Sequence, residues 1–232
     1  VYAITIISIV LFGIVVPDTK HEAGSKRDNL DVSTEKTKIS SMVAFYTGYL
    51  FLIYVGFMTI IYKVATLMIS MHYGTAAEAS NVLAGITIVG FVASSMFGKV
   101  HERFKMFTLP ISVIFIGISI YIIGASTSMM TTIIGALILG LFFAFVTPYF
   151  FYRATLYSNA ASQTLSSSIM IIGINLGCFL NPYVLAFVNK LFGTTSITFS
   201  VKFAGVFILA LGVINILVTS VKRGTYKAVK NN

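Results

Sequence analysis

Long apolar runs separated by short polar segments follow one another along most of the sequence. Each of six runs is close to the ~20 residues that a helix needs to cross ~30 Å of hydrocarbon. None alternates with a period of two, as a membrane-spanning strand would. Because a helix satisfies its own backbone hydrogen bonds in lipid, the pattern predicts an all-α integral membrane protein with a six-helix transmembrane bundle over 42–221. The six runs lie at 42–62, 81–98, 106–125, 129–152, 168–188 and 203–221.

A shorter apolar run, 1–16, opens the chain. It has no basic segment before it and no small-residue cleavage site after it, so it is not typical of a signal peptide. We interpret it as the end of a truncated transmembrane helix, and the chain as a fragment of a longer protein. Residues 17–41 hold five basic and five acidic side chains, which indicates a flexible charged linker. A basic tail, 222–232, follows the last run.

The basic residues mark one side of the membrane. When successive loops are assigned to alternate sides, thirteen of the 16 Lys and Arg residues share a side with the linker and the tail. Only Lys63, Lys190 and Lys202 fall on the other side. Because basic loops stay in the cytoplasm, the split predicts a cytoplasmic linker and C-terminus in a multi-pass protein of the plasma membrane.

Composition excludes several other classes of protein. Hydrophobic residues make up 57% of the chain and charged residues 10%, against about 25% charged residues in a soluble domain. These values exclude a soluble globular domain and a disordered tail, and the single Cys178 excludes an internal disulfide. The net charge of +9 comes from basic residues that punctuate apolar runs, so it indicates membrane topology and no nucleic-acid partner.

No residue pattern points to an enzyme. The three histidines, His21, His72 and His101, fall in different loops, and the sequence has no GxSxG, HExxH or Walker A run. We expect no catalytic residue, metal or cofactor. None of the six runs contains Asp or Glu, the usual intramembrane proton carriers. A proton carrier is therefore expected in the missing part of the protein, if protons are the coupling ion.

Residues near the ends of the runs have structural interpretations. Thr75-Ala76-Ala77-Glu78 has the spacing of a helix capping box, which we favour over a proton gate at Glu78. Lys63 either reaches the outer interface or, if its helix continues, points into a cavity that attracts an anionic group. The sequence has no Trp, so interfacial anchoring is expected from tyrosines, namely Tyr62 and Tyr73 outside and Tyr46, Tyr152 and Tyr157 inside.

Small residues recur at every fourth position in three of the runs. Such stripes allow helix backbones to approach closely in lipid, so they predict tight helix packing. The alternative, that the same faces slide during a conformational change, stays open. The stripes are Gly90, Ser94 and Gly98; Ala136, Gly140 and Ala144, with Pro148 next; and Gly173 and Gly177, with Asn181 next.

The junction after 81–98 has the sharpest local pattern. Gly98 ends one run, and Glu102, Arg103 and Lys105 follow within one short segment. We hypothesise that these four residues form a cytoplasmic latch. In it, Glu102 and Arg103 make charge-assisted hydrogen bonds with neighbouring helix ends in one conformation and release them in another. The alternative is that the basic residues only set the topology.

This junction resembles a motif of the major facilitator superfamily. Gly98-x-x-x-Glu102-Arg103-x-Lys105 is similar to that family's G-x-x-x-D-R-x-x-[RK] loop, with Glu102 in place of the usual Asp. The charged linker resembles the family's central loop. Gly173-Ile174-Asn175-Leu176-Gly177, followed by Asn181-Pro182, resembles its eleventh helix. The resemblance covers nearly the whole chain and corresponds to the C-terminal half of the fold, with 1–16 as the end of helix six.

The resemblance implies half of a major facilitator fold, with a substrate site between the two halves near the bilayer midplane. Four runs (42–62, 81–98, 129–152 and 168–188) would line the cavity, and the other two would lie nearer the lipid. Mid-depth aromatic and polar residues on the lining runs are then the substrate-cavity candidates, although packing inside the bundle is the alternative for each of them. These candidates are Tyr49, Tyr54, Phe57, Phe143, Thr147 and Asn175.

The leading hypothesis is a secondary active transporter that moves a small solute by alternating access. Its partners would be the lipid bilayer, the solute, the missing N-terminal six-helix half and, for proton-coupled transport, protons. An aromatic lining without acids suggests an uncharged, amphipathic or weakly anionic solute. A non-transporting membrane scaffold or assembly factor is the alternative. An ABC-type permease subunit is a third class, but the inner loops 99–105 and 153–167 are too short for a convincing coupling helix.

Overall fold

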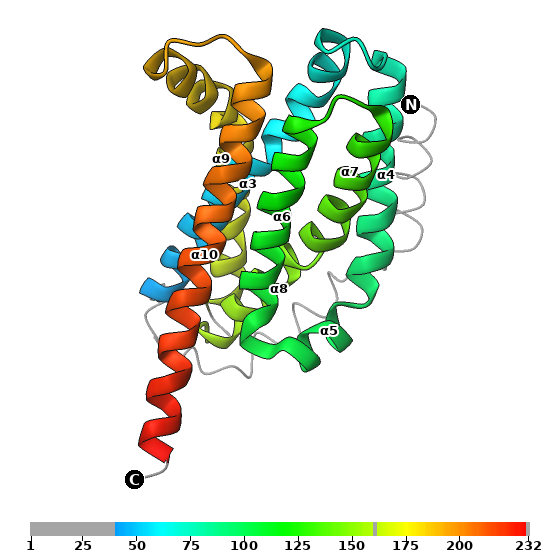
Figure 1. The fold of residues 1–232 in the computed structure, drawn as a ribbon. Helices are drawn as coiled ribbons and strands as arrows, with labels where there is room; N and C mark the ends of the chain where they lie inside the picture. Colours follow the sequence, from blue (N-terminus) through cyan, green and yellow to red (C-terminus); the bar gives the residue numbers. More distant parts are fainter. Residues whose placement is uncertain (1–39, 160–161, 231–232) are drawn as a thin grey trace, which may run out of the picture. The chain divides into compact units, whose positions relative to one another are not determined.

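Six membrane-length helices make up the part of the chain that the structure describes (Figure 1). The computed structural model describes residues 40–159 and 162–230, with side chains up to residue 220. All six predicted spans and the all-α class are confirmed, whereas 1–16 and most of the linker lie outside the described residues. The spans are Ser41–Ser70, Ala76–Ser95, Phe97–Ala125, Met129–Leu156, Gln163–Leu191 and Ile197–Ser220.

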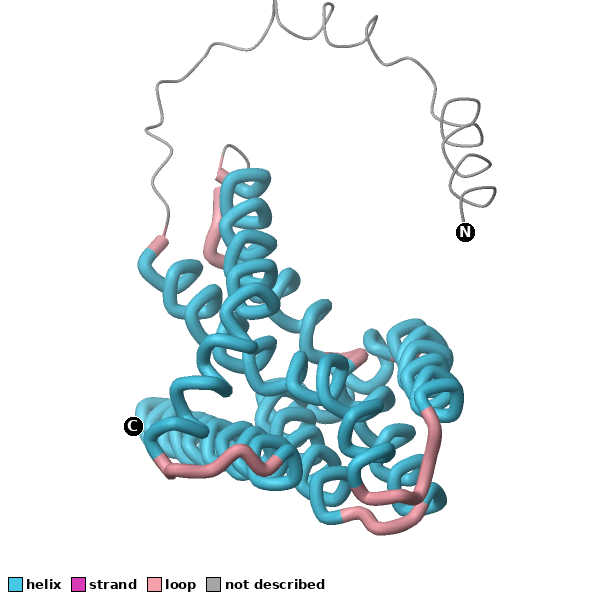
Figure 2. Tube along the Cα trace, turned by 90° about the horizontal axis from the view of Figure 1, so that it is seen from above, coloured by secondary structure: helices cyan, strands magenta, loops and turns pink. Residues whose placement is uncertain are grey.

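Short loops join the helices (Figure 2). The third span consists of α5, the 3₁₀ helix η1 and α6, and the fourth consists of α7 and α8. The elements are α3 (Ser41–Ser70), α4 (Ala76–Ser95), α5 (Phe97–Phe104), η1 (Lys105–Phe107), α6 (Thr108–Ala125), α7 (Met129–Phe143), α8 (Val146–Leu156), α9 (Gln163–Leu191) and α10 (Ile197–Lys230).

Two helices extend beyond the apolar runs that predict them. α3 continues past Lys63 to Ser70, and α10 continues through 222–230 of the predicted tail. A lysine near a membrane surface does not end a helix, because its long side chain can carry the ammonium group to the interface. At 1.5 Å per residue, the 30 residues of α3 span about 45 Å. This length exceeds the ~30 Å hydrocarbon core, so α3 must tilt or project from the membrane.

The predicted run 129–152 is broken in the structure. α7 ends at Phe143 and α8 begins at Val146. Pro148 explains the break, because it has no backbone N–H for the carbonyl of Ala144 and its ring crowds that carbonyl. At the break, the backbone N–H of Phe145 donates to the oxygen of Phe142, three residues earlier, at 3.3 Å.

The first helix of the described bundle, α3, packs against α4, α6, α8, α9 and α10. In addition, α6 packs along α10 and α7, and α4 packs along α7. The interior of the bundle is aliphatic and aromatic, as expected where helices bury side chains against one another. Its largest fully buried side chains include Leu50, Ile53, Ile60, Leu67, Ile116, Ile120, Leu139, Phe150, Met170 and Ile208.

Small residues set several of the closest helix contacts. A Cβ atom at Gly140 would lie 2.5 Å from the carbonyl oxygen of Ile86, and one at Gly177 would lie 2.8 Å from that of Phe51. The predicted packing role of these two stripes is confirmed. Gly117 of α6 likewise allows α6 to approach α10 closely, because a Cβ there would lie 2.5 Å from the backbone nitrogen of Leu209. The stripes identified in the sequence do not include this third contact.

Candidate functional site

A groove of about 350 Å³ opens between α3, α4 and the broken pair α7–α8. Its lining extends from the middle of these spans to the last turn of α4. Its wall is mainly apolar, with three hydroxyl groups and no charged side chain. The lining residues are Phe57, Ile86, Thr87, Gly90, Ser94, Gly140, Phe143, Ala144, Thr147 and Pro148.

Three of the six predicted substrate-cavity residues, Phe57, Phe143 and Thr147, line this groove, and a fourth, Tyr54, contacts them from behind the lining. The rings of Phe57 and Phe143 are stacked, with centroids 3.6 Å apart and planes 7° apart. The Tyr54 ring meets Phe143 edge to face at 5.3 Å. The hydroxyl oxygens of Tyr54 and Thr147 lie 2.9 Å apart in a hydrogen bond. These ring contacts and this hydrogen bond connect α3 with the residues on both sides of the break between α7 and α8.

The break itself shapes the groove. Phe143 is the last residue of α7 and Thr147 is near the start of α8, and both line the groove. Pro148 leaves the carbonyl of Ala144, a lining residue, without its usual helical donor. Together, this carbonyl and the wall hydroxyls give a mostly apolar groove a few polar groups.

The remaining hydroxyls of the groove can accept hydrogen bonds. Thr87 donates its hydroxyl proton to the oxygen of Leu83 at 3.1 Å, and Ser94 donates to that of Phe91 at 2.8 Å. Because each proton is used within its own helix, the oxygen lone pairs remain for an incoming donor. The groove thus suits an amphipathic molecule with hydrogen-bond donors.

The other two predicted cavity residues lie elsewhere. The Tyr49 hydroxyl donates to the carbonyl oxygen of Leu211 in α10 at 3.0 Å, away from the groove lining. Asn175 is exposed, and its amide nitrogen donates to the oxygen of Ile171 in its own helix at 2.9 Å. Neither residue contributes to the groove.

The polar residue buried deepest in α9 is Asn181, which continues the small-residue stripe of Gly173 and Gly177. Its side-chain nitrogen donates to the carbonyl oxygen of Val55 at 2.6 Å and to the hydroxyl of Thr59 at 2.9 Å. These bonds join α9 to α3 with no exposed surface on Asn181. The next residue, Pro182, deprives the carbonyl of Cys178 of its helical donor, and the Tyr62 hydroxyl donates to that carbonyl at 3.4 Å.

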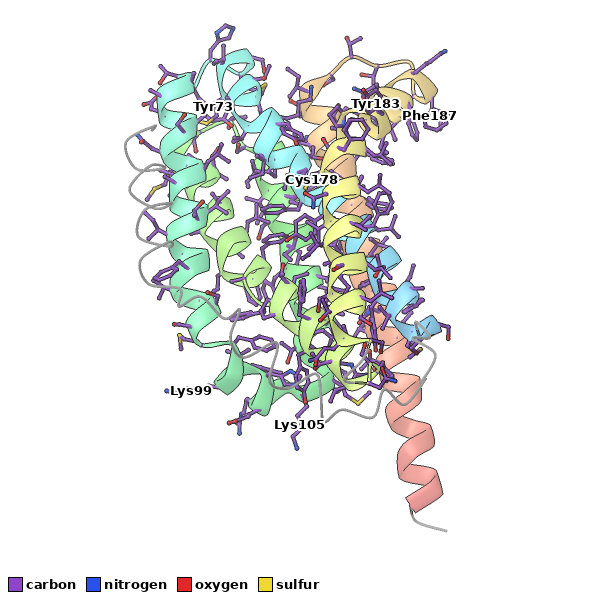
Figure 3. The ribbon with its side chains drawn as sticks, turned by 180° about the vertical axis from the view of Figure 1, so that it is seen from behind. Tyr73, Lys99, Lys105, Cys178, Tyr183 and Phe187 are labelled. Atoms are coloured by element: carbon purple, nitrogen blue, oxygen red, sulfur yellow. The ribbon has the colours of Figure 1, made fainter. Side chains whose placement is uncertain are left out.

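The predicted latch residues lie at one end of the bundle, on and next to α5 (Figure 3). Gly98, Glu102, Arg103 and Lys105 are all exposed. Within the described residues, neither Glu102 nor Arg103 forms an ion pair. Their charges are therefore available to groups outside the described residues. Lys99 and Lys105 mark this end in Figure 3, and Tyr73 marks the opposite end.

The predicted capping box at the start of α4 is confirmed. A Glu78 carboxylate oxygen accepts hydrogen bonds from the Thr75 backbone N–H at 2.8 Å and from its hydroxyl at 2.9 Å. In return, the Glu78 N–H donates to the Thr75 hydroxyl oxygen at 3.3 Å. This geometry gives Glu78 a structural role at the end of the bundle opposite to the latch.

We expect Thr75→Ala to lower the free energy of unfolding by about 1 kcal/mol, because it removes the N-cap oxygen. Glu78→Gln should have a smaller effect, since a Gln side chain can also complete a capping box. Thermal unfolding of the full-length protein in detergent measures both. Ser80→Ala is the control, because the Ser80 hydroxyl bonds only to its own helix. Equal effects of Thr75→Ala and Ser80→Ala would contradict the capping role.

The sequence matches no model of a known protein family and no curated protein. Its class therefore rests on the fold: with six membrane-length apolar helices, the chain is a multi-pass integral membrane protein embedded in a lipid bilayer. Among the described residues, no group of three or more His, Cys, Asp or Glu side chains could hold a metal ion.

Proposed function

We propose that this chain is the C-terminal half of a secondary active transporter of the major facilitator type, which moves a small amphipathic solute across the plasma membrane. The observation that carries the proposal is the groove between α3, α4 and α7–α8. It combines stacked aromatic rings with hydroxyl groups near the middle of the membrane spans. Such a lining suits a molecule with an apolar body and a few polar groups.

The broken helix supports the same function. Transporter sites are typically built from discontinuous membrane helices, whose unwound backbone offers polar groups at the midplane. Here the break at Ala144 lies in the groove wall. Solute would bind between this wall and a second six-helix half, and the two halves would rock to expose it to each side in turn.

The exposed latch fits this mechanism. Glu102 and Arg103 have no ion-pair partner within the described residues, so they can bind helix ends of the second half in one conformation and leave them in another. The groove wall has no acidic side chain, so a proton carrier, where transport is proton-coupled, belongs to the second half.

The basic end of the bundle is expected to face the cytoplasm. In a full-length protein without other cysteines, with Cys178→Ser, a membrane-impermeant maleimide should label Thr127→Cys but not Lys99→Cys from outside intact cells. Both positions are exposed. Lys99 marks one end of the bundle in Figure 3, and Thr127 follows Ser126, whose hydroxyl bonds to Tyr73 at the opposite end. Labelling of Lys99→Cys alone would show that the basic end faces outward, which is the reverse of the predicted topology.

The function is tested by transport assays on the full-length protein in proteoliposomes, against a panel of amphipathic solutes with and without a proton gradient. Saturable uptake of at least one solute is expected. Correct insertion without transport of any solute would favour a membrane scaffold over a transporter.

A further inference from the structure

Arg153 lies in a cage of tyrosines at the end of the bundle that carries the latch. It belongs to the last turn of α8 and is half-buried. Its Nε and Nη2 atoms donate to the Tyr46 hydroxyl at 3.3 and 3.2 Å, and Nη2 also donates to the Tyr157 hydroxyl at 3.3 Å. The guanidinium carbon lies 5.9 and 5.4 Å from the centroids of these two rings. The cage thus fixes the cation by hydrogen bonds and cation–π contacts.

Several donors of this cage have no acceptor within residues 40–159 and 162–220. A guanidinium group has five N–H bonds, and the two on Nη1 meet no acceptor among the described residues. Tyr46 and Tyr157 each accept from Arg153 and their hydroxyls also interact with each other, so at most one of their two protons is left for an incoming acceptor. The cage therefore presents a set of convergent donors around one fixed positive charge.

No carboxylate of the described bundle neutralises this charge. Those residues include two acids, Glu78 and Glu102. Glu78 lies in the capping box at the opposite end, and Glu102 is exposed without an ion pair in the described bundle. Lys99, Arg103 and Lys105 add further positive charge at the same end. The local field therefore favours an anion.

A second group of aromatic side chains packs together at this end of the bundle. The His101 ring, on α5, stacks on Phe97 at 5.5 Å and meets Tyr149 and Tyr152 of α8 edge to face at 5.6 and 5.0 Å. These contacts hold α5 against α8. They keep the backbone that carries Arg153 in place, so that the donors are arranged before an anion arrives.

We propose that Arg153, Tyr46 and Tyr157 form a binding site for a phosphate group. A phosphate oxyanion offers several acceptor oxygens, which match a cluster that has only donors left. The two N–H bonds left on Nη1 can donate to phosphate oxygens, and the guanidinium group keeps its charge at any physiological pH. The phosphate can belong to the headgroup of an anionic phospholipid or to a soluble ion. The site lies apart from the solute groove and does not depend on which solute is carried.

The test uses the full-length protein purified in detergent. Native mass spectrometry measures the affinity for phosphatidylglycerol, with phosphatidylcholine as the zwitterionic comparison, and calorimetry measures the affinity for inorganic phosphate. Arg153→Gln should weaken anion binding about tenfold or more, the effect of losing one charge-assisted hydrogen bond. Lys99→Gln is the matched control, because it removes one exposed charge at the same end and should have a smaller effect.

Tyr157→Phe keeps the charge and the ring but removes one donor, so it tests the site even if Arg153→Gln fails to fold. It should weaken binding about threefold or more. Arg153-dependent binding of phosphatidylglycerol, preferred over phosphatidylcholine, would assign the site to lipid, and Arg153-dependent binding of inorganic phosphate alone would assign it to a soluble ion. The proposal is overturned if Arg153→Gln and Tyr157→Phe change neither affinity more than Lys99→Gln does.

Discussion

Replacing Gly117 with alanine is expected to destabilise the bundle more than any single methyl group added on its surface. The new Cβ would lie 2.5 Å from the backbone nitrogen of Leu209 and 2.7 Å from its Cα. Backbone atoms cannot move aside as a flexible side chain can, so α6 and α10 must separate. Overpacking of this kind costs about 1–3 kcal/mol, which corresponds to a fall in Tm of roughly 2–12 °C.

Gly85→Ala is the matched control for this prediction. A Cβ at Gly85 would meet only the end of the Leu137 side chain, at 3.8 Å, an ordinary van der Waals contact. Alanine also has a higher helix propensity than glycine, so this variant should be as stable as the parent protein or more stable. Thermal unfolding of the full-length protein in detergent compares the two. Equal melting temperatures would mean that α6 and α10 do not pack as closely as described.

Removing the hydroxyl groups that meet at the groove should impair transport while the protein still folds. Thr147→Val keeps the shape of the side chain but deletes its hydroxyl, and Tyr54→Phe deletes the partner of that hydroxyl. If the solute bonds to this pair, each loss leaves a polar group unpaired in a desolvated site. We expect the transport rate at low solute concentration to fall about tenfold.

Tyr49→Phe provides a matched comparison on the same helix. It makes the same chemical change as Tyr54→Phe, but the Tyr49 hydroxyl bonds to the carbonyl of Leu211 in α10. We expect Tyr49→Phe to reduce stability by about 0.5–1.5 kcal/mol and to leave the transport rate per folded molecule unchanged. If Tyr49→Phe and Tyr54→Phe impair transport equally, the groove has no special role in solute binding.

Hydrophobic length alone predicts the number and type of the spans, because a membrane helix must be apolar over about 20 residues. Their ends are harder to predict. The helix that contains Lys63 does not stop there, since a lysine can reach the interface from within a helix. The break between α7 and α8 has a signal in the sequence, Pro148, whose missing N–H acts four residues upstream.

Asn175 and Asn181 of α9 show what the sequence could have revealed about the site. They are six positions apart, which at ~100° per residue places them about 240° apart around the helix. Gly173 and Gly177 share a face with Asn181, so the small-residue stripe already indicates that Asn181 packs against a neighbour. By the same periodicity, Asn175 lies off the packed face, which is where the structure places it.

Contacts between distant segments could not be predicted from local patterns. Tyr46 and Tyr157 fit the pattern of interfacial anchors, and Arg153 that of a topology signal. The hydrogen bonds between Arg153 and Tyr46 depend on how α3 and α8 pack, across more than a hundred residues of chain, whereas the bond between Arg153 and Tyr157 spans only four positions. The stacking of Phe57 on Phe143 is similarly non-local. Such pairs require the tertiary arrangement, because one sequence gives no information on which helices are neighbours.

Access to the groove from both sides of the membrane is the most direct test of the proposed mechanism. The measurement uses Ala144→Cys, a lining position, in full-length protein without other cysteines, and a membrane-impermeant maleimide. A transporter that works by alternating access should be labelled both in intact cells and in inside-out vesicles, and a transported solute should slow labelling from each side. Labelling from one side only, or from neither, would contradict alternating access through this groove.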